Sequence, residues 1–122
     1  MAGADRWELV YYETAAGRCP VREFLDDLSA EQAERVVRKL DLVEALGTRL
    51  DPPHVKPLRG RIWELRVTGR LQHRVLYAAV VGRRIVLLHA FTKKVQRTPP
   101  GEIALAEVRL DDYLRRLERE EP

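Results

Sequence analysis

The 122-residue sequence predicts an α+β fold in which three consecutive strands form an antiparallel sheet and two N-terminal helices cover one of its faces. Two observations predict this fold. The segments 62–68, 73–80 and 85–91 have the composition of strands and are separated by glycine-containing turns. Two stretches with apolar residues at helical spacing precede these segments, and a third follows them. The expected order is β-α-α-β-β-β-α, within one domain over residues 1–122.

The N-terminal segment predicts one strand followed by one helix. Residues 7–12 read WELVYY, which is apolar and aromatic enough to lie in the sheet. Gly17 breaks this strand. Pro20 suits the first turn of a helix, and apolar residues then recur at helical spacing as far as Leu28.

A second helix is expected to follow the first directly. Ser29, with Gln32 three residues later, has the pattern of a capping box. The apolar stripe of this helix runs from Ala33 to Leu46, and Gly47 supplies the stop. The two helices would form an amphipathic hairpin that needs a sheet to pack against.

Side-chain alternation in the segment 62–68 defines the two faces of the sheet. The apolar set is Trp63, Leu65 and Val67, and the polar set is Glu64, Arg66 and Thr68. We expect the helical hairpin to cover the apolar set. Arg74, on the next strand, shares a face with Arg66 only if an odd-numbered loop or a bulge joins the two strands. Leu71 and Gln72 favour a loop longer than two residues.

The last strand and the final helix complete the pattern. Residues 85–91, IVLLHAF, are apolar on both faces, as in a central strand. Thr98 and Pro99 offer an N-cap and a first-turn proline for a helix whose apolar stripe extends to Leu117. Residues 54–61, which precede the sheet, are expected to form a polar loop.

Positive charge is concentrated in the stretch 56–97. This stretch holds 11 of the 22 lysines and arginines but only one of the 19 acidic residues, so it is formally +10 and the rest of the chain is 11 − 18 = −7. A sheet face rich in arginine and flanked by lysines is suited to bind phosphate groups. The alternative interpretation is a solvated charged face without a ligand.

A few residues near these cations are candidates for acid–base chemistry. Glu64 is the one carboxylate of the stretch and is interpreted as orienting a neighbouring arginine, with a role as general base as the alternative. His54 and His73 are expected at the edges of the basic surface, exposed enough to contact a ligand. His89 lies in an apolar strand and is interpreted as a hydrogen-bonded core residue.

The motif content argues against several classes of enzyme. No spacing of His, Asp or Glu resembles a metal site, no glycine-rich loop precedes a helix, and no Ser or Cys lies in a nucleophile motif. We therefore expect neither a metal nor a cofactor. Metal-free RNA cleavage is compatible with what remains, because the RNA supplies its own 2′-hydroxyl nucleophile. Composition alone leaves this reaction and passive nucleic-acid binding as alternatives.

Cysteine content and hydropathy indicate where the protein works. Cys19 is the one cysteine, so a disulfide framework is not expected. No apolar run approaches the roughly 20 residues of a membrane span, so we expect no membrane partner. These features favour the reducing cytoplasm.

Three segments in this order of elements resemble a known family: VKPLRGRIWELRV, RVLY and IVLLHAFTKKVQRTPPGEIALAEVR. They are similar to the phage-derived Gp49-like branch of the HigB/RelE toxin superfamily, and the resemblance extends from Trp7 to about Leu117. It implies a RelE-like fold and a ribosome-dependent endoribonuclease that cuts mRNA. It also implies a cognate helix-turn-helix antitoxin, through which the pair would bind operator DNA.

The resemblance also implies which residues form the site. It points to Arg66, Arg74, Lys93 and Lys94 as catalytic residues and to Lys56 and Arg59 as RNA-binding residues. From the basic stretch itself we add Glu64 to the catalytic candidates and Arg61, His54, His73 and Arg97 to the RNA-binding candidates. One feature departs from the family pattern. RelE-type enzymes place a tyrosine beyond the last strand, and here residues 96–99 read QRTP. Tyr77 is the nearest tyrosine, but strand parity puts it on the helix-covered face.

Three functions are thus compared. The first is a type II toxin that acts as a metal-independent endoribonuclease. The second is a ParE-like inhibitor of DNA gyrase without nuclease activity, and the third is a nucleic-acid-binding accessory protein. The dense cluster of cations favours the first function, because gyrase inhibition needs no phosphate-binding surface.

Overall fold

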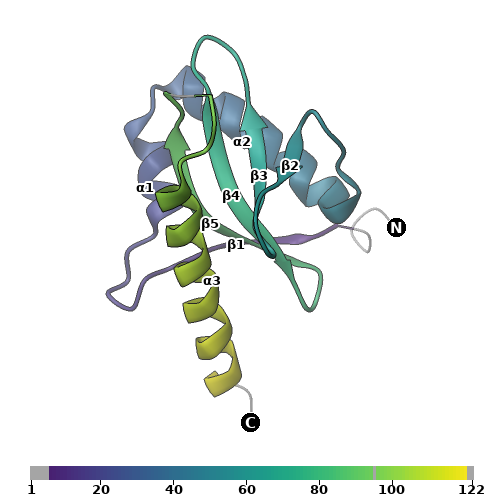
Figure 1. The fold of residues 1–122 in the computed structure, drawn as a ribbon, viewed down its shortest axis with the longest axis vertical. Coiled ribbons are helices and arrows are strands. Elements are labelled where there is room, and N and C mark those ends of the chain that lie inside the picture. Colours follow the sequence, from purple (N-terminus) through teal and green to yellow (C-terminus); the bar gives the residue numbers. More distant parts are fainter. Residues whose placement is uncertain (1–5, 95, 121–122) are drawn as a thin grey trace.

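The computed structural model describes residues 6–94 and 96–120, and in this part of the chain a five-stranded sheet lies between a helical hairpin and a C-terminal helix (Figure 1). The predicted α+β fold is confirmed. The elements are β1 (Glu8–Tyr11), α1 (Pro20–Asp27), α2 (Ala30–Leu46), a 3-10 turn η2 (Gly47–Arg49), β2 (Val55–Pro57), β3 (Trp63–Val67), β4 (His73–Val80), β5 (Arg84–Thr92) and α3 (Pro100–Glu120).

The sheet is mixed, with the strand order β1-β5-β4-β3-β2. Strands β2 to β5 pair in antiparallel fashion, but β1 runs parallel to β5. The prediction of an antiparallel sheet is therefore wrong at this edge. The reason is that β1 pairs with the last strand of the sheet rather than with a neighbour in sequence, so no hairpin turn fixes its direction.

Strand β2 lies where the sequence predicted a polar loop. Val55, Lys56 and Pro57 pair with Leu65, Glu64 and Trp63 of β3. Proline disfavours a strand because it lacks an N–H donor, but an edge strand tolerates it. The Val55 side chain is 1% exposed, so its burial in the core stabilises the short pairing between β2 and β3. Strand β2 is therefore an edge strand of the sheet, next to β3.

The caps of α2 follow the sequence signals. The Ser29 Oγ accepts a hydrogen bond from the Gln32 backbone N–H at 3.2 Å, which is one of the two bonds of the predicted capping box, and the Gln32 side chain contacts His73 instead of forming the other. Gly47 ends the helix with φ +51°. A Cβ at Gly47 would collide with the indole ring of Trp7, so glycine is needed there both for its backbone conformation and for space.

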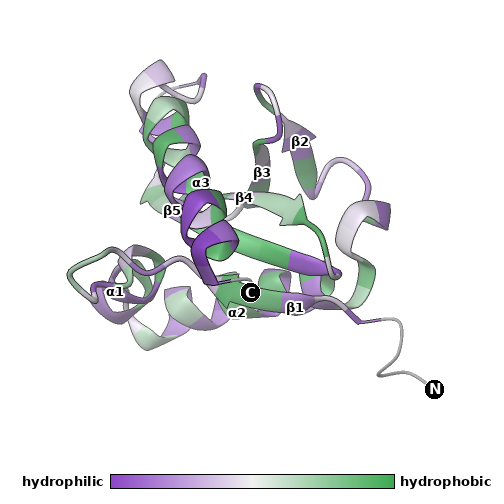
Figure 2. Cartoon of the chain, turned by 90° about the horizontal axis from the view of Figure 1, so that it is seen from below, coloured by the Kyte–Doolittle hydropathy of each residue, from purple (hydrophilic) through white to green (hydrophobic). Residues whose placement is uncertain are grey.

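Both faces of the sheet are buried, each against different helices. The hairpin α1–α2 packs on the face that presents Leu65, Val75 and Leu87. Helix α3 packs on the opposite face through Ala106 and Leu110. Figure 2 shows apolar residues of the helices turned toward the sheet on both sides. The face that presents Glu64 and Arg66 is thus covered by α3 along its apolar part, and its polar end lies beside the start of this helix.

Helix α3 is the longest helix of the protein and begins at Pro100, one residue later than the predicted first-turn proline. Its outer surface is polar over most of its length (Figure 2). Within residues 6–94 and 96–120, no helix combines the length and the hydropathy that a membrane span requires.

Strand β5 contains one extra residue. Leu76 of β4 pairs with His89, whereas the next residue, Tyr77, pairs with Leu87, so Leu88 has no partner across the ladder. This bulge changes the parity of the strand from His89 onward. Leu88 packs in the core on the α3 side, and His89 on the same side contacts α3.

Candidate functional site

Arg66 and Arg74 are direct cross-strand partners on the α3 face of the sheet. The connection between β3 and β4 is the odd-numbered loop 68–72, which is the condition for the two residues to share a face. The predicted geometry is confirmed. The Arg66 side chain is 30% exposed and that of Arg74 is 6% exposed. Arg66 is therefore the more accessible of the two arginines, and Arg74 lies beside it, nearly buried.

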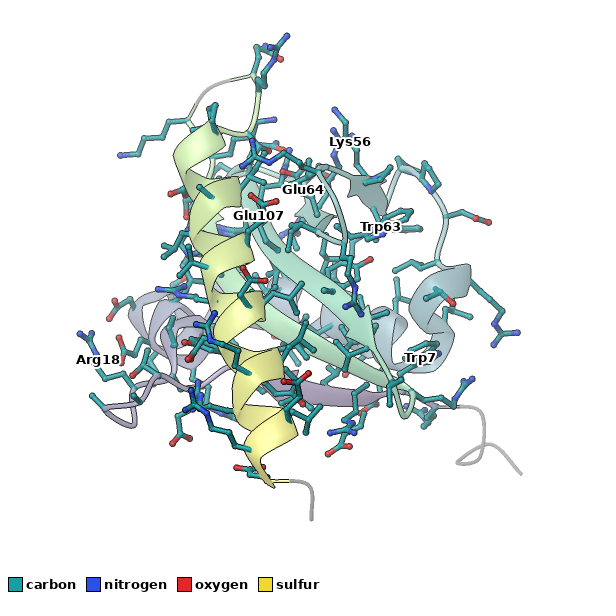
Figure 3. The ribbon with its side chains drawn as sticks, turned by 60° about the horizontal axis from the view of Figure 1, so that its bottom comes forward. Trp7, Arg18, Lys56, Trp63, Glu64 and Glu107 are labelled. Atoms are coloured by element: carbon teal, nitrogen blue, oxygen red, sulfur yellow. The ribbon has the colours of Figure 1, made fainter. Side chains whose placement is uncertain are left out.

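Glu64 holds the two arginines together. Its side chain is 1% exposed, and its Oε1 lies 3.3 Å from the Nε of Arg66 and 3.6 Å from the Nε of Arg74. Its Oε2 accepts a hydrogen bond from the Thr98 hydroxyl. Figure 3 shows Glu64 between α3 and the sheet. Because both carboxylate oxygens are engaged, this geometry favours orientation of the arginines over a role as general base.

The guanidinium of Arg74 is fixed by its neighbours. Its Nη1 donates to the His73 carbonyl at 2.9 Å, and its Nη2 donates to the Gln72 Oε1 at 3.5 Å. Its Nε has no hydrogen-bond partner among the described residues and contacts Glu64 only electrostatically. Burial lowers the pKa of Arg74, and the charge of Glu64 opposes this effect. Arginine nevertheless stays protonated in proteins, so a fixed positive charge lies at this point.

Lys93 projects into the same region from the end of β5. Its backbone N–H donates to the Gln72 carbonyl at 2.6 Å, which fixes the chain as it leaves the strand. Burial and, after it, the charge of Arg74 lower the pKa of Lys93 below its usual value. Lys94 is exposed, whereas Lys93 is half-buried.

Two adjoining hollows surround these side chains and together form what we call the basic groove. The first, of about 400 Å³, is lined by Lys56, Pro57, Leu58, Arg59, Glu64, Arg66, Lys93, Gln96, Arg97, Thr98, Pro100 and Ile103. The second, of about 620 Å³, is lined by Gln72, Arg74, Lys93, Lys94 and Gln96. Lys93 lines both hollows and Lys94 only the second. Lys93 is thus the more central of the two lysines.

Three of the predicted RNA-binding cations line the basic groove. Lys56, the cross-strand partner of Glu64, extends outward at its rim (Figure 3). Arg97 and Arg59 line it as well. Arg59 also pairs with Glu107 of α3 at 2.7 Å, so it ties the helix to the loop after β2. Arg61 does not line the groove, because its Nη2 donates to the Ala79 carbonyl at 2.9 Å near the other end of β4.

Comparison with known protein families identifies the relatives of this chain. The family model described as phage derived protein Gp49-like (DUF891) matches residues 23–111. The chain belongs to the Gp49-like family. This is a HigB/RelE-like toxin family, so the Gp49-like protein is toxin-like and its fold is consistent with the RelE-like fold. The match covers the sheet from β2 to β5 and the start of α3, and so the whole basic groove. No curated protein matches the chain.

His73 of the Gp49-like protein is buried, and the prediction that it is exposed is wrong. It pairs with Val67 and faces the hairpin, where its Nε2 lies 2.8 Å from the Gln32 Oε1 and its Nδ1 lies 3.0 Å from the Thr92 Oγ1. Burial lowers its pKa. Strand parity contained this information, because the alternation that turns Arg74 toward α3 turns His73 toward the hairpin.

His54 and His89 also lie outside the basic groove. His54 is half-buried, and its Nδ1 accepts a hydrogen bond from the Lys39 Nζ at 2.8 Å. The His89 side chain is 14% exposed and stands between Arg109, 3.2 Å from its Nδ1, and Glu102, 3.2 Å from its Nε2. His89 is therefore half-buried rather than a residue of the apolar core, and charged residues of α3 lie on both sides of its ring. Its Nε2 has no hydrogen-bond partner among the described residues.

Thr98 and Gln96 belong to the site although the sequence did not indicate it. Thr98 was predicted to cap the last helix, but α3 starts at Pro100 and the Thr98 hydroxyl donates to Glu64 instead. Gln96 lines both hollows of the groove. Neither role has a local signal, because each depends on how the segment after β5 folds back over β3. In the described part of the Gp49-like protein, no group of three or more His, Cys, Asp or Glu residues is arranged to hold a metal ion.

Proposed function

We propose that this Gp49-like protein is the toxin of a type II toxin–antitoxin system and that it cleaves mRNA on the ribosome without a metal ion. The observation that carries the proposal is the convergence of Arg66, Arg74 and Lys93 on one groove around a single buried carboxylate. A site with this excess of positive charge is suited to a phosphodiester whose negative charge increases in the transition state.

The proposed reaction is attack of an RNA 2′-hydroxyl on the adjacent phosphate, in which the hydroxyl proton passes to water, the new 2′ O–P bond forms and the bond from phosphorus to the 5′ oxygen breaks. Arg66, which is partly exposed, and Arg74 behind it would stabilise the pentavalent phosphorane. Lys93 would donate a proton to the leaving oxygen. Its lowered pKa supports this role, because an ammonium group that releases its proton more readily is a better general acid.

Glu64 is assigned a positioning role in this reaction. It is the one carboxylate among the residues that line the two hollows, and Arg66 and Thr98 occupy its two oxygens. Lys56, Arg59 and Arg97 would hold the flanking phosphates along the rim of the groove. The proposed partners are a cognate helix-turn-helix antitoxin and mRNA on the ribosome, in the cytoplasm, with operator DNA bound only through the antitoxin.

The decisive experiment maps RNA ends after a short induction of the protein in a growing culture. We expect growth arrest together with new 5′ ends inside translated mRNA, and the loss of both in a Lys93→Ala variant. Arrest without new ends in the parent protein would favour the gyrase-directed function instead. Absence of both arrest and cleavage, with RNA still bound by the purified protein, would favour the accessory function.

A further inference from the structure

A second cluster of cations lies on the other side of the end of β3. Between helix α2 and this strand end is a cleft of about 220 Å³, lined by Arg35, Arg38, Lys39, Leu42, Val67 and Thr68. Three of these six residues are cations and none is a carboxylate. Arg66 of β3 lines the basic groove on the α3 side of the sheet, whereas Val67, the last residue of the strand, and Thr68 after it line this cleft on the hairpin side.

The cations of this cleft are held in place. The Nη2 of Arg35 donates to the Thr68 carbonyl at 2.5 Å, and its guanidinium lies against Gly69, where a Cβ would collide with it. The Lys39 Nζ donates to the His54 Nδ1 at 2.8 Å. Neither Arg35 nor Lys39 forms an ion pair with a carboxylate among the described residues, whereas Arg38 pairs with Glu34 at 2.6 Å. Two positioned positive charges are therefore available to a ligand.

We propose that Arg35 and Lys39 form a second phosphate-binding site, which takes the backbone of an RNA strand that leaves the basic groove around the end of β3. This inference rests on the proposed function. The pairing with β2 ends at Leu65 and the Arg66 backbone N–H donates to the His54 carbonyl at 2.8 Å, so among the described residues no strand covers this edge from Val67 onward. Arg66 and Thr68 are about 7 Å apart along the strand, and a stretch of RNA backbone longer than this can also pass around the edge from one face of the sheet to the other. The continuity of positive charge across this edge favours RNA over an acidic protein segment.

The site predicts a dependence of binding on RNA length. The test measures fluorescence anisotropy with uncleavable 2′-O-methyl RNA, as a tetranucleotide that fills only the groove and as a dodecanucleotide that also reaches the cleft. Arg35→Ala/Lys39→Ala should bind the short RNA as the parent protein does and the long RNA more weakly. For the long RNA, the slope of log K against log salt should fall by about 1.4, because each lost phosphate contact on a single strand contributes about 0.7.

The matched control is Arg115→Ala/Arg119→Ala, which removes two exposed cations at the same spacing from α3. It should leave both affinities unchanged. An Arg35→Gln/Lys39→Gln variant removes the charges but keeps hydrogen-bonding groups, and it replaces the alanine variant if that variant melts early. An unchanged salt slope in a folded variant, or an equal loss in the control, would overturn the proposal.

Two further outcomes are informative. If the cleft variant keeps the long RNA but loses an oligoglutamate peptide that the parent protein binds, the cleft is a protein-binding surface and the proposal is wrong. Because the RNA is uncleavable, the result is independent of catalysis. A length-dependent loss would support the second site even if RNA-end mapping found no cleavage, and cleavage with no length dependence would support the proposed function alone.

Discussion

At the scale of single residues, Lys93 and Lys94 are expected to differ although they are neighbours of the same charge. Lys93→Ala should slow mRNA cleavage by about 30- to 1000-fold, because a lost charge-assisted contact to the transition state costs about 2–4 kcal/mol. Lys94→Ala should have a much smaller effect, since Lys94 is exposed and lines only the second hollow. The free energy of unfolding of both variants should lie within about 0.5 kcal/mol of that of the parent protein.

Cleavage assays on purified variants, run beside urea unfolding, check this prediction. Full activity of both variants would mean that these lysines are surface charges and that the proposed site is misplaced.

Thr98 offers a second prediction at this scale. Thr98→Val removes a hydroxyl without changing the volume much, and it leaves the buried Glu64 Oε2 without its donor. A buried acceptor that loses its partner costs about 1–3 kcal/mol, so both stability and cleavage should fall. Thr98→Ser keeps the hydroxyl and should restore most of both. Equal losses in the valine and serine variants, measured by unfolding and by cleavage rate, would show that the methyl group matters rather than the hydrogen bond.

At the scale of elements, α3 is held to the sheet by its apolar face and forms one wall of the basic groove. Leu110 is 5% exposed and packs against the sheet, whereas Val108, on the same helix, is 62% exposed. Leu110→Ala should lower the free energy of unfolding by about 2–5 kcal/mol. Val108→Ala should change it by no more than about 0.5 kcal/mol. Similar denaturation midpoints for the two variants would contradict the packing described here.

The sequence predicts those elements whose signals are local. The capping box at Ser29 and the stop at Gly47 bound α2, and alternation in β3 with an odd-numbered loop places Arg66 beside Arg74. It does not predict the β1–β5 pairing or the contact of Thr98 with Glu64, because both join residues far apart in the chain. Local residue preferences carry no information on which distant segments meet.

At the scale of the whole molecule, stability should depend on pH through two histidines. Burial lowers the pKa of His73 and of His89, with Arg35 and Arg74 acting in the same direction on His73. Near His89, the charge of Arg109 also lowers the pKa, and that of Glu102 opposes it. In both cases the unfolded chain binds more protons than the folded one as the pH falls through the unfolded value of about 6.5. The stability conferred by the two neutral side chains is therefore present above this pH and is lost below it.

Urea unfolding measured at about pH 7 and about pH 5 checks this expectation, because the midpoint should fall with pH in the parent protein. A His73→Gln variant should show a smaller difference between the two conditions. If the difference is unchanged in this variant, the imidazole of His73 does not contribute.

The bulge in β5 has a consequence for how the length of this chain can vary. Leu88 is the one residue without a partner in the β4–β5 ladder, so the strand can lose it without changing the partners of the other residues. Deletion of Leu88 would let β4 and β5 pair without interruption, and the remaining hydrophobic pattern would still be that of a strand. His89, Ala90 and Phe91 would keep their partners Leu76, Val75 and Arg74, and cross-strand partners share a face, so Phe91 would stay on the α3 side. An in-frame deletion of Leu88 would thus leave a paired sheet in which the segment after β5 still starts from the side of the basic groove.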